Sequence, residues 1–332
     1  MRQKPRRNRL AAKRRLHRAA HPLVLGIIAP ATVILPANAN LIIDPTFDVS
    51  ITSDPNAAAI ENAINTTIGI YETDFTDPIT VAIRFQEGGG LGGSSTFFAS
   101  VSYASYLAAL QADASTSSDL TALAHLPASP NNPVNGNSTI DVKSANLRAV
   151  GINVSPPAGQ PDGTITLNMS LTSPGSPGTS AQYILQVVTE HEIDEVLGLG
   201  SSLPRTPSET IFPEDLFRYD ASGNRSFTTN SLAKAFFSID TTTDLAQFDN
   251  QNDGGDFGDW QSNPLPPGVA PKVQDAFATP GANPSLGVEL TALDVVGYNV
   301  AVTPAISEPG TLAMLATSLL GLGVLRRRKG KG

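Results

Sequence analysis

Residues 190–201 read EHEIDEVLGLGS and contain the most informative pattern in the chain. The spacing of one α-helical face runs from Ile184 through Val187, Val188, His191 and Glu195. Thr189, Glu190 and Asp194 fall on the other side of the same helix. The spacing therefore predicts a helix with a histidine and a glutamate on its apolar face, where an ordinary amphipathic helix has leucine.

A lone carboxylate on an apolar face is costly to bury, so Glu195 needs a cationic partner. Residues four apart on a helix lie within about 5–6 Å of each other, which allows both to bind one ion. Histidine nitrogen and carboxylate oxygen are ordinary zinc ligands. We therefore expect His191 and Glu195 to hold a zinc ion.

Glu192 directly follows the first expected ligand. From this position a glutamate can take a proton from a water molecule whose pKa the metal lowers from about 16 to about 7. We expect Glu192 to be the general base of a hydrolytic site. Gly198, seven residues after His191, is expected to permit the sharp turn that ends the helix.

A catalytic zinc normally has three protein ligands and an open position. The acidic segment after the helix offers Glu209, Glu214, Asp215 and Asp220. Asp215 is the preferred third ligand because it follows the helix after a short excursion; the alternative is a solvated aspartate or one paired with Arg218. His125 is expected at a helix end rather than at the metal.

A second acidic segment is rich in glycine and asparagine and contains Asp249, Asp253, Asp256 and Asp259. Carboxylate oxygens suit Ca²⁺, which makes calcium a further candidate cofactor. The spacing is not that of an EF-hand, and a solvated turn region is the favoured alternative. Trp260 is expected to pack in the core.

The two ends of the chain differ from the part between them. Residues 1–39 contain a basic run, an apolar run over 23–35 and then Ala37-Asn38-Ala39, which is the order of a secretory signal peptide. The alternative is a basic arm that binds nucleic acid. Residues 306–332 contain SEPG, an apolar stretch over 311–325 and an arginine cluster. This stretch is shorter than the ~20 residues that span a bilayer comfortably, so a sorting tail is expected.

The segment between the ends is strongly acidic. Of 22 Lys and Arg, nine lie in residues 1–39 and five in 308–332, which leaves eight against 29 Asp and Glu, a net charge of −21. Such a charge repels nucleic acid and attracts cations, so no nucleic-acid partner is expected. The chain has no cysteine. Its stability must therefore come from core burial or bound metal.

The pattern of residues 40–305 predicts one mixed α/β (α+β) domain. Strands are expected at 79–85 and 163–169, and a glycine-rich flexible loop at 88–93. Helices are expected at 54–71, 102–111, 119–126 and 286–298. We expect a twisted sheet with the His191 helix packed against it, followed by a loop-rich C-terminal part.

The C-terminal tail resembles the PEP-CTERM signal of Gram-negative bacteria, with Ser307 in place of its first proline. The resemblance implies processing by an exosortase-type enzyme and association with an envelope or exopolysaccharide. It also implies export through the inner membrane to the cell envelope or surface, or secretion after C-terminal processing.

The helix resembles the metzincin pattern His-Glu-x-x-His-x-x-Gly-x-x-His, but has Glu195 and Ser201 in place of two histidines. It lacks the metzincin methionine, since the only methionines are Met1, Met169 and Met314. The segments 191–198, 215–219, 255–260 and 290–298 together are similar to a family of PEP-CTERM-bearing bacterial metalloproteases. The resemblance implies a zincin-like domain, a usual His-Glu-x-x-Glu helix and zinc-dependent hydrolysis of peptides.

The leading prediction is thus an exported zinc metallopeptidase with a protein or peptide substrate. His191 and Glu195 would bind zinc, Glu192 would act as base, and Asp215 would complete the site. One alternative is a non-catalytic cell-envelope or biofilm matrix protein with a degenerate metal site. Another is a calcium-dependent adhesin that uses the second acidic segment.

Overall fold

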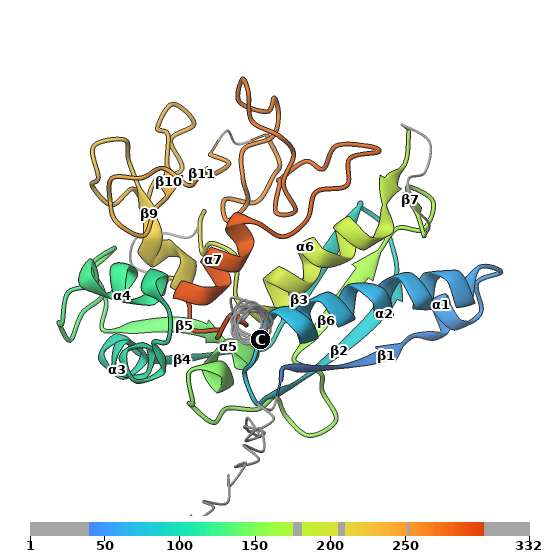
Figure 1. The fold of residues 1–332 in the computed structure, drawn as a ribbon, viewed down its shortest axis with the longest axis horizontal. Coiled ribbons are helices and arrows are strands. Elements are labelled where there is room, and N and C mark those ends of the chain that lie inside the picture. Colours follow the sequence, from blue (N-terminus) through green and yellow to red (C-terminus); the bar gives the residue numbers. More distant parts are fainter. Residues whose placement is uncertain (1–39, 175–180, 205–209, 251–252, 302–332) are drawn as a thin grey trace, which may run out of the picture. The chain divides into compact units, whose positions relative to one another are not determined.

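A computed structural model of the chain describes residues 40–174, 181–204, 210–250 and 253–301, all within one compact unit (Figure 1). The signal peptide expected at 1–39 and the sorting signal expected at 306–332 lie outside the described residues. No helix in the described part is long and apolar enough to cross a membrane.

The central sheet has four strands in the order β1 (Ile42–Phe47), β2 (Thr80–Glu87), β6 (Gly163–Leu167) and β3 (Gly92–Thr96). The first three run parallel and β3 runs antiparallel at one edge. Val81, Ile83 and Phe85 alternate along β2 and are fully buried, as expected for a half-buried strand. Both strands predicted from the sequence are therefore present.

The glycine-rich segment 88–93 was expected to be a flexible loop, but its last two residues begin strand β3. Gly92 pairs with Leu167 and Gly93 with Thr166 of β6. Strand pairing uses main-chain groups, so it tolerates residues without side chains although it gains no packing from them. The low strand propensity of glycine is overridden here by the neighbouring strand.

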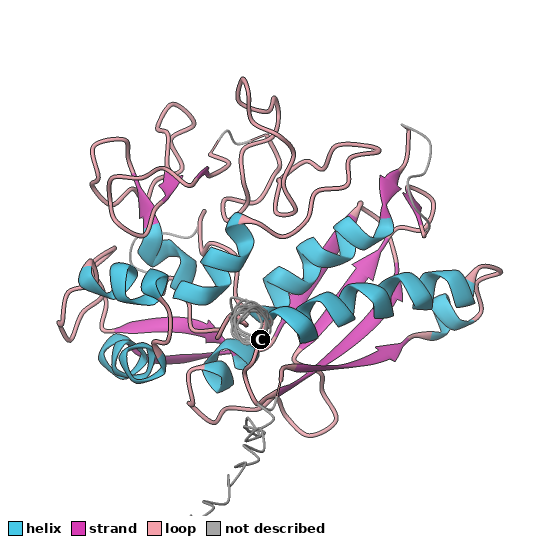
Figure 2. Ribbon diagram, in the orientation of Figure 1, coloured by secondary structure: helices cyan, strands magenta, loops and turns pink. Residues whose placement is uncertain are grey.

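Helix α6 (Leu185–Leu197) contacts β3 and β6 of the sheet and also helix α2 (Ala57–Asp74). In Figure 2 the two helices run side by side over the sheet. The apolar face predicted for the first helix is confirmed, because Ile60, Ile64, Ile68 and Tyr71 are all buried. The Tyr71 hydroxyl donates to the Asp194 carboxylate at 2.7 Å and contacts the Glu190 carbonyl at 2.8 Å. The side of α6 opposite His191 is therefore buried against α2.

Helix α1 (Val49–Thr52) precedes α2 in the chain. Three further helices follow strand β2: α3 (Tyr103–Asp113), α4 (Ser117–Ala124) and α5 (Ser144–Ala149). Strands β4 (Phe98–Ser102) and β5 (Thr139–Lys143) form a two-stranded sheet that the sequence did not predict. The helices predicted at 102–111 and 119–126 correspond to α3 and α4.

The C-terminal part consists mainly of long loops around small elements. These are β7 (Thr172–Ser173), β8 (Tyr183–Ile184), the 3₁₀ helix η1 (Pro213–Phe217), β9 (Arg218–Tyr219), β10 (Phe236–Phe237), β11 (Ala246–Gln247) and α7 (Val288–Val295). Trp260 is buried against Phe237 and Phe248, with ring centroids 5.7 and 5.1 Å apart, so its predicted core position is confirmed. The predicted mixed α+β class with a loop-rich C-terminal part is also confirmed.

Asp294 of α7 is a buried carboxylate with incomplete hydrogen bonding. Its Oδ2 accepts from the Thr116 hydroxyl at 2.7 Å, while Oδ1 has no partner. Burial and the nearby carboxylates of Asp119, Asp113 and Asp77 together raise the pKa of Asp294 to about 7, although the hydrogen bond from Thr116 lowers it. The ionised form is therefore disfavoured in the folded state.

This arrangement predicts that Asp294→Asn stabilises the protein at neutral and alkaline pH. An unfolded aspartate ionises near pH 3.9, whereas the folded group ionises near pH 7. The contribution of Asp294 to the free energy of unfolding therefore becomes unfavourable as the pH rises from about 4 to 7, and it stays so at higher pH. We expect the variant to gain on the order of 2 kcal/mol at pH 8 and nothing at pH 4.

Thermal unfolding between pH 4 and 8 measures this difference. The exposed Asp244→Asn, which makes the same change of charge, is the control and should give no comparable gain. Equal melting temperatures of wild type and Asp294→Asn at pH 8 would contradict the interpretation.

Candidate metal centre

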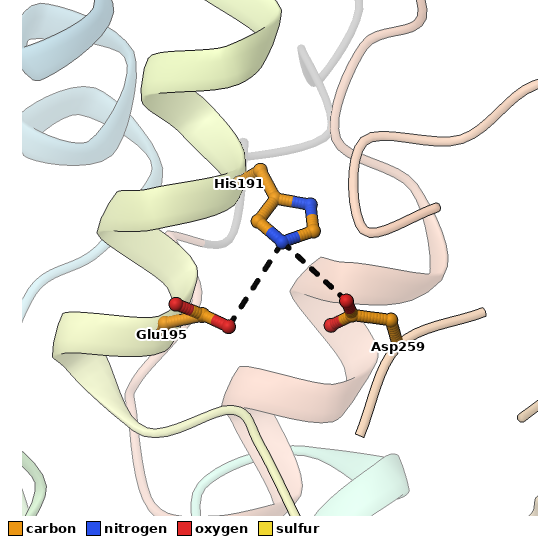
Figure 3. Close-up of side chains that lie close together, drawn as sticks. All are labelled: His191, Glu195 and Asp259. Atoms are coloured by element: carbon orange, nitrogen blue, oxygen red, sulfur yellow. Dashed lines mark ion pairs between the residues drawn. The ribbon is translucent and has the colours of Figure 1, made fainter. Parts of the chain in front are cut away.

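His191 and Glu195 lie one turn apart on α6, and Asp259 approaches them from the loop before Trp260 (Figure 3). His191 Nε2 is 3.9 Å from Glu195 Oε1 and 3.7 Å from Asp259 Oδ2. One possible ligand atom from each residue lies within 4.8 Å of the others, and no second group of three such residues occurs in the described part of the chain. The structure therefore contains one candidate metal centre there.

The donor set fits a zinc ion. Ligands about 2.0–2.2 Å from a shared tetrahedral ion stand about 3.3–3.6 Å from one another. The separations of 3.7 and 3.9 Å from His191 Nε2 are slightly longer, and all three possible ligand atoms lie within 4.8 Å of one another, so side-chain movements would be needed to bring them around one ion. One nitrogen and two carboxylate oxygens also leave a fourth position open.

The imidazole of His191 is oriented by the backbone. Its Nδ1 lies 3.1 Å from the Val273 carbonyl oxygen, which can only accept a hydrogen bond. The proton of the neutral ring is therefore on Nδ1, and the Nε2 lone pair faces the two carboxylates. This is the tautomer that a metal ligand needs.

Glu195 is fixed from both its side chain and its main chain. Its Oε2 accepts a hydrogen bond of 2.6 Å from the Ser94 hydroxyl on β3, while Oε1 is the oxygen nearer to His191. The buried ammonium of Lys143 donates to the carbonyls of Glu195 and Leu199. The end of α6 is thus held at the position where Glu195 faces the histidine.

Asp259 is buried, and its loop contacts the end of α6 closely. A Cβ at Gly258 would lie 2.5 Å from the Gly200 Cα and 2.5 Å from the Ser201 nitrogen, so only glycine permits this backbone contact. The Gln274 amide nitrogen donates to Asp259 Oδ1 at 2.9 Å. Asp259 Oδ2 remains directed towards His191.

Two influences on His191 oppose each other. Burial lowers the pKa of His191, but the carboxylates of Asp259, Glu192 and Glu195 raise it to about 10 and favour the imidazolium. The Gln274 amide nitrogen, a donor only 3.2 Å from Nε2, favours the neutral ring. A bound cation would take the place of the proton at Nε2 and would compensate the charge of the carboxylates.

Glu192 lies beside His191 and Glu195 and is almost fully buried. It is 4% exposed, and its Oε2 has no hydrogen-bond partner. A Cβ at Gly92 of β3 would lie only 2.2 Å from Glu192 Oε1, so the missing side chain makes room for this carboxylate. Burial raises the pKa of Glu192, and Glu195 adds to the effect.

A cleft of about 540 Å³ opens beside these side chains. It is lined by residues 90–94 around β3, by His191, Glu192 and Glu195 of α6, and by the loops 254–256 and 275–278. Tyr183, Val187 and Phe277 supply apolar surface in the same cleft. The candidate metal centre is therefore accessible to a ligand of substantial size.

The third ligand predicted from the sequence was Asp215, but the structure places Asp259 beside His191 and Glu195 instead. Asp215 is buried and accepts from the Ser202 nitrogen, the Ser202 hydroxyl and the Phe212 nitrogen, each at 3.0 Å. It also accepts from the Ser201 hydroxyl at 2.5 Å. These bonds hold the start of η1, so this carboxylate has a structural role.

Of the other sequence-based candidates, Asp256 lines the same cleft as His191 but is not one of the three residues whose possible ligand atoms lie within 4.8 Å of one another. Among the described residues, Asp249, Asp253 and Asp256 belong to no group of three acidic or histidine side chains whose ligand atoms lie within 4.8 Å of one another, and a calcium site stays a prediction. His125 is the exposed C-cap of α4, as expected. Glu209 lies outside the described residues.

The turn after α6 also differs from the prediction. Gly198 is the C-cap but has a φ of 174°, an extended conformation that any residue adopts. Gly200 has a φ of +128°, which favours glycine. The residue that needs the conformational freedom of glycine is therefore Gly200.

No protein-family model, curated protein or solved structure matches this chain. The functional argument consequently depends on the site itself.

We predict that the purified chain binds about one divalent zinc ion and that His191→Ala, Glu195→Ala and Asp259→Ala each weaken binding. Loss of one of three ligands should raise the dissociation constant at least about 100-fold. Metal content by mass spectrometry and competition with a chelating indicator measure the effect.

The exposed Asp253→Asn is the control and should bind as wild type. Asp215→Asn should lower the melting temperature but retain the ion. Unchanged affinity in Asp259→Ala would exclude Asp259 as a ligand.

Proposed function

We propose that this protein is an exported zinc-dependent metallopeptidase that hydrolyses peptide bonds. The observation that carries the proposal is the position of Glu192, a buried carboxylate without a partner on Oε2, beside His191, Glu195 and Asp259 in one cleft. A metal group, a base and a substrate-sized cavity are the three parts that metal-assisted hydrolysis requires.

The zinc, when bound, supplies an acidic water molecule and polarises the substrate carbonyl. Glu192 takes the proton from the attacking water on its carboxylate while the new carbon–oxygen bond forms. It then delivers the proton to the amide nitrogen as the carbon–nitrogen bond breaks. Burial raises the pKa of Glu192 to about 9 in the metal-free chain, which favours its protonated form; a cation bound beside it would lower this pKa and favour the carboxylate that accepts the proton.

A peptide substrate is supported by strand β3. This strand is at the edge of the sheet, is paired with β6 on one side, and its residues Gly92, Gly93 and Ser94 line the cleft. The unpaired main-chain groups of an edge strand can bind an extended peptide as an additional strand. Such a peptide would pass directly beside Glu192 and the metal ligands.

The alternative of a non-catalytic envelope or matrix protein is favoured by one observation. Asp259 belongs to the C-terminal loops, whereas His191 and Glu195 belong to α6, so a bound ion would cross-link two parts of the fold. A metal that only cross-links would not require a general base. The effect of replacing Glu192 on peptide hydrolysis therefore distinguishes the two functions.

We predict that Glu192→Gln binds zinc as wild type but loses peptide hydrolysis. The amide retains the size of the carboxylate but cannot accept the proton, so kcat/KM should fall at least about 100-fold. Cleavage of an unfolded protein such as casein, alongside metal content, measures both properties. Wild-type rates in this variant would exclude the assigned role of Glu192.

A second prediction uses the two adjacent glycines of β3. Gly92→Ala should displace the Glu192 carboxylate, because the new methyl group would lie 2.2 Å from Oε1 and 2.9 Å from Val188 Cγ1. We expect at least a tenfold loss of hydrolysis. Gly93→Ala is the matched control, since no atom lies within 4 Å of its added Cβ, and it should retain activity. Equal rates for the two variants would contradict this placement.

A further inference from the structure

Two consecutive residues, Val273 and Gln274, contact two of the three candidate metal ligands. The Val273 carbonyl oxygen lies 3.1 Å from Nδ1 of His191. The Gln274 amide nitrogen lies 2.9 Å from Asp259 Oδ1 and 3.2 Å from His191 Nε2. One short segment thus orients a ligand from α6 and a ligand from the C-terminal loops.

The orientation of the Gln274 amide follows from its neighbours. The side chain is fully buried, and its Oε1 has no hydrogen-bond partner. Exchange of the amide oxygen and nitrogen would place two acceptors, Oε1 and Asp259 Oδ1, against each other. The arrangement in which nitrogen faces Asp259 is therefore favoured.

The segment is itself held by a buried network. Glu289 Oε1 on α7 accepts from the Gln274 backbone nitrogen at 3.1 Å and from the Trp260 indole nitrogen at 2.9 Å. The Trp260 backbone nitrogen donates to the Gln274 carbonyl at 2.8 Å. Because Trp260 directly follows Asp259, this network fixes the distance between Gln274 and the aspartate.

We propose that Gln274 is a positioning residue of the metal centre, which holds Asp259 by its amide and releases Nε2 of His191 when a metal binds. The inference depends on the metal centre of the proposed function, but not on its peptidase activity. The amide nitrogen has two hydrogens, one for each present contact. Coordination uses the Nε2 lone pair, so only the contact with Asp259 persists, and Oδ2 of Asp259 stays directed at the ion.

A direct ligand role for Gln274 would require the opposite orientation. Its Oε1 would have to turn towards the ion, and the hydrogen bond to Asp259 would be lost. A purely structural role would affect the stability of the metal-free chain but not the metal affinity. The three roles therefore give different results in binding experiments.

The test is the zinc affinity of Gln274→Met, which retains the length of the side chain but has no donor. We expect the dissociation constant to rise about 10–100-fold, as is typical when a group that orients a metal ligand is removed. The exposed Gln111→Met of α3 is the control and should bind as wild type. Wild-type or tighter binding by Gln274→Met would overturn the proposal.

A double-mutant cycle with Asp259→Ala separates positioning from direct coordination. If Gln274 acts through Asp259, Gln274→Met should cost less than about threefold in the Asp259→Ala background. A cost that persists at 10–100-fold would identify Gln274 as a direct ligand and overturn the proposal.

Crystal structures of the wild-type chain with and without zinc provide the second measurement, which does not depend on the folding of a variant. We expect the Gln274 amide nitrogen to remain within hydrogen-bond distance of Asp259 and to leave His191 Nε2 in the zinc-bound form. Coordination of zinc by Gln274 Oε1 would refute the inference. A wild-type chain that binds no zinc would refute the metal centre itself, whereas a chain that binds zinc without hydrolysing peptides would refute only the proposed function.

Discussion

The structure depends on how the charge of one buried acidic helix is compensated. Helix α6 contains Glu190, Glu192, Asp194 and Glu195, and it packs on β3 and β6 of the sheet and against α2. On the side facing α2, the carboxylate of Asp194 is bonded to Tyr71, and Gln186 donates to Glu190 at 2.9 Å. On the cleft side Glu195 and Asp259 face His191, and their other side-chain hydrogen-bond partners, Ser94 and Gln274, are neutral. A bound divalent cation would compensate these carboxylates, in addition to the buried ammonium of Lys143.

The C-terminal loops place the carboxylate of Asp259 beside helix α6. They have little regular secondary structure. Buried hydrogen bonds among Trp260, Glu289 and Gln274 nevertheless hold Asp259 in position beside α6. Direct backbone contact between Gly258 and Gly200 fixes the approach of the same loop. Precision in this part of the molecule therefore comes from buried hydrogen bonds and close packing rather than from helices and strands.

The sequence predicted secondary structure correctly where apolar residues recur with the period of a helix or of a strand. Helical spacing located α6 and placed His191 and Glu195 on one face, and the alternation along β2 located that strand. Asp259 could not be selected from its neighbours, because nothing local distinguishes an aspartate that meets the helix from one that is solvated. Asp215 was preferred for its nearness in sequence, whereas the serine hydroxyls and backbone nitrogens that surround it are visible only in three dimensions. Strand β3 was missed because glycine gives no side-chain pattern, although its main chain pairs fully with β6.

The long separation in sequence between the ligands has a consequence for the order of events during synthesis. His191 and Glu195 precede Asp259 by more than sixty residues. A growing chain that has only reached the end of α6 presents two of the three ligands, and the ion cannot be enclosed before the later loops have docked. Closing such a long connection costs little more entropy than closing one of half its length, so the intervening segment can vary in length at small cost. Enclosure of an ion at this site would therefore follow the docking of the C-terminal loops rather than precede it.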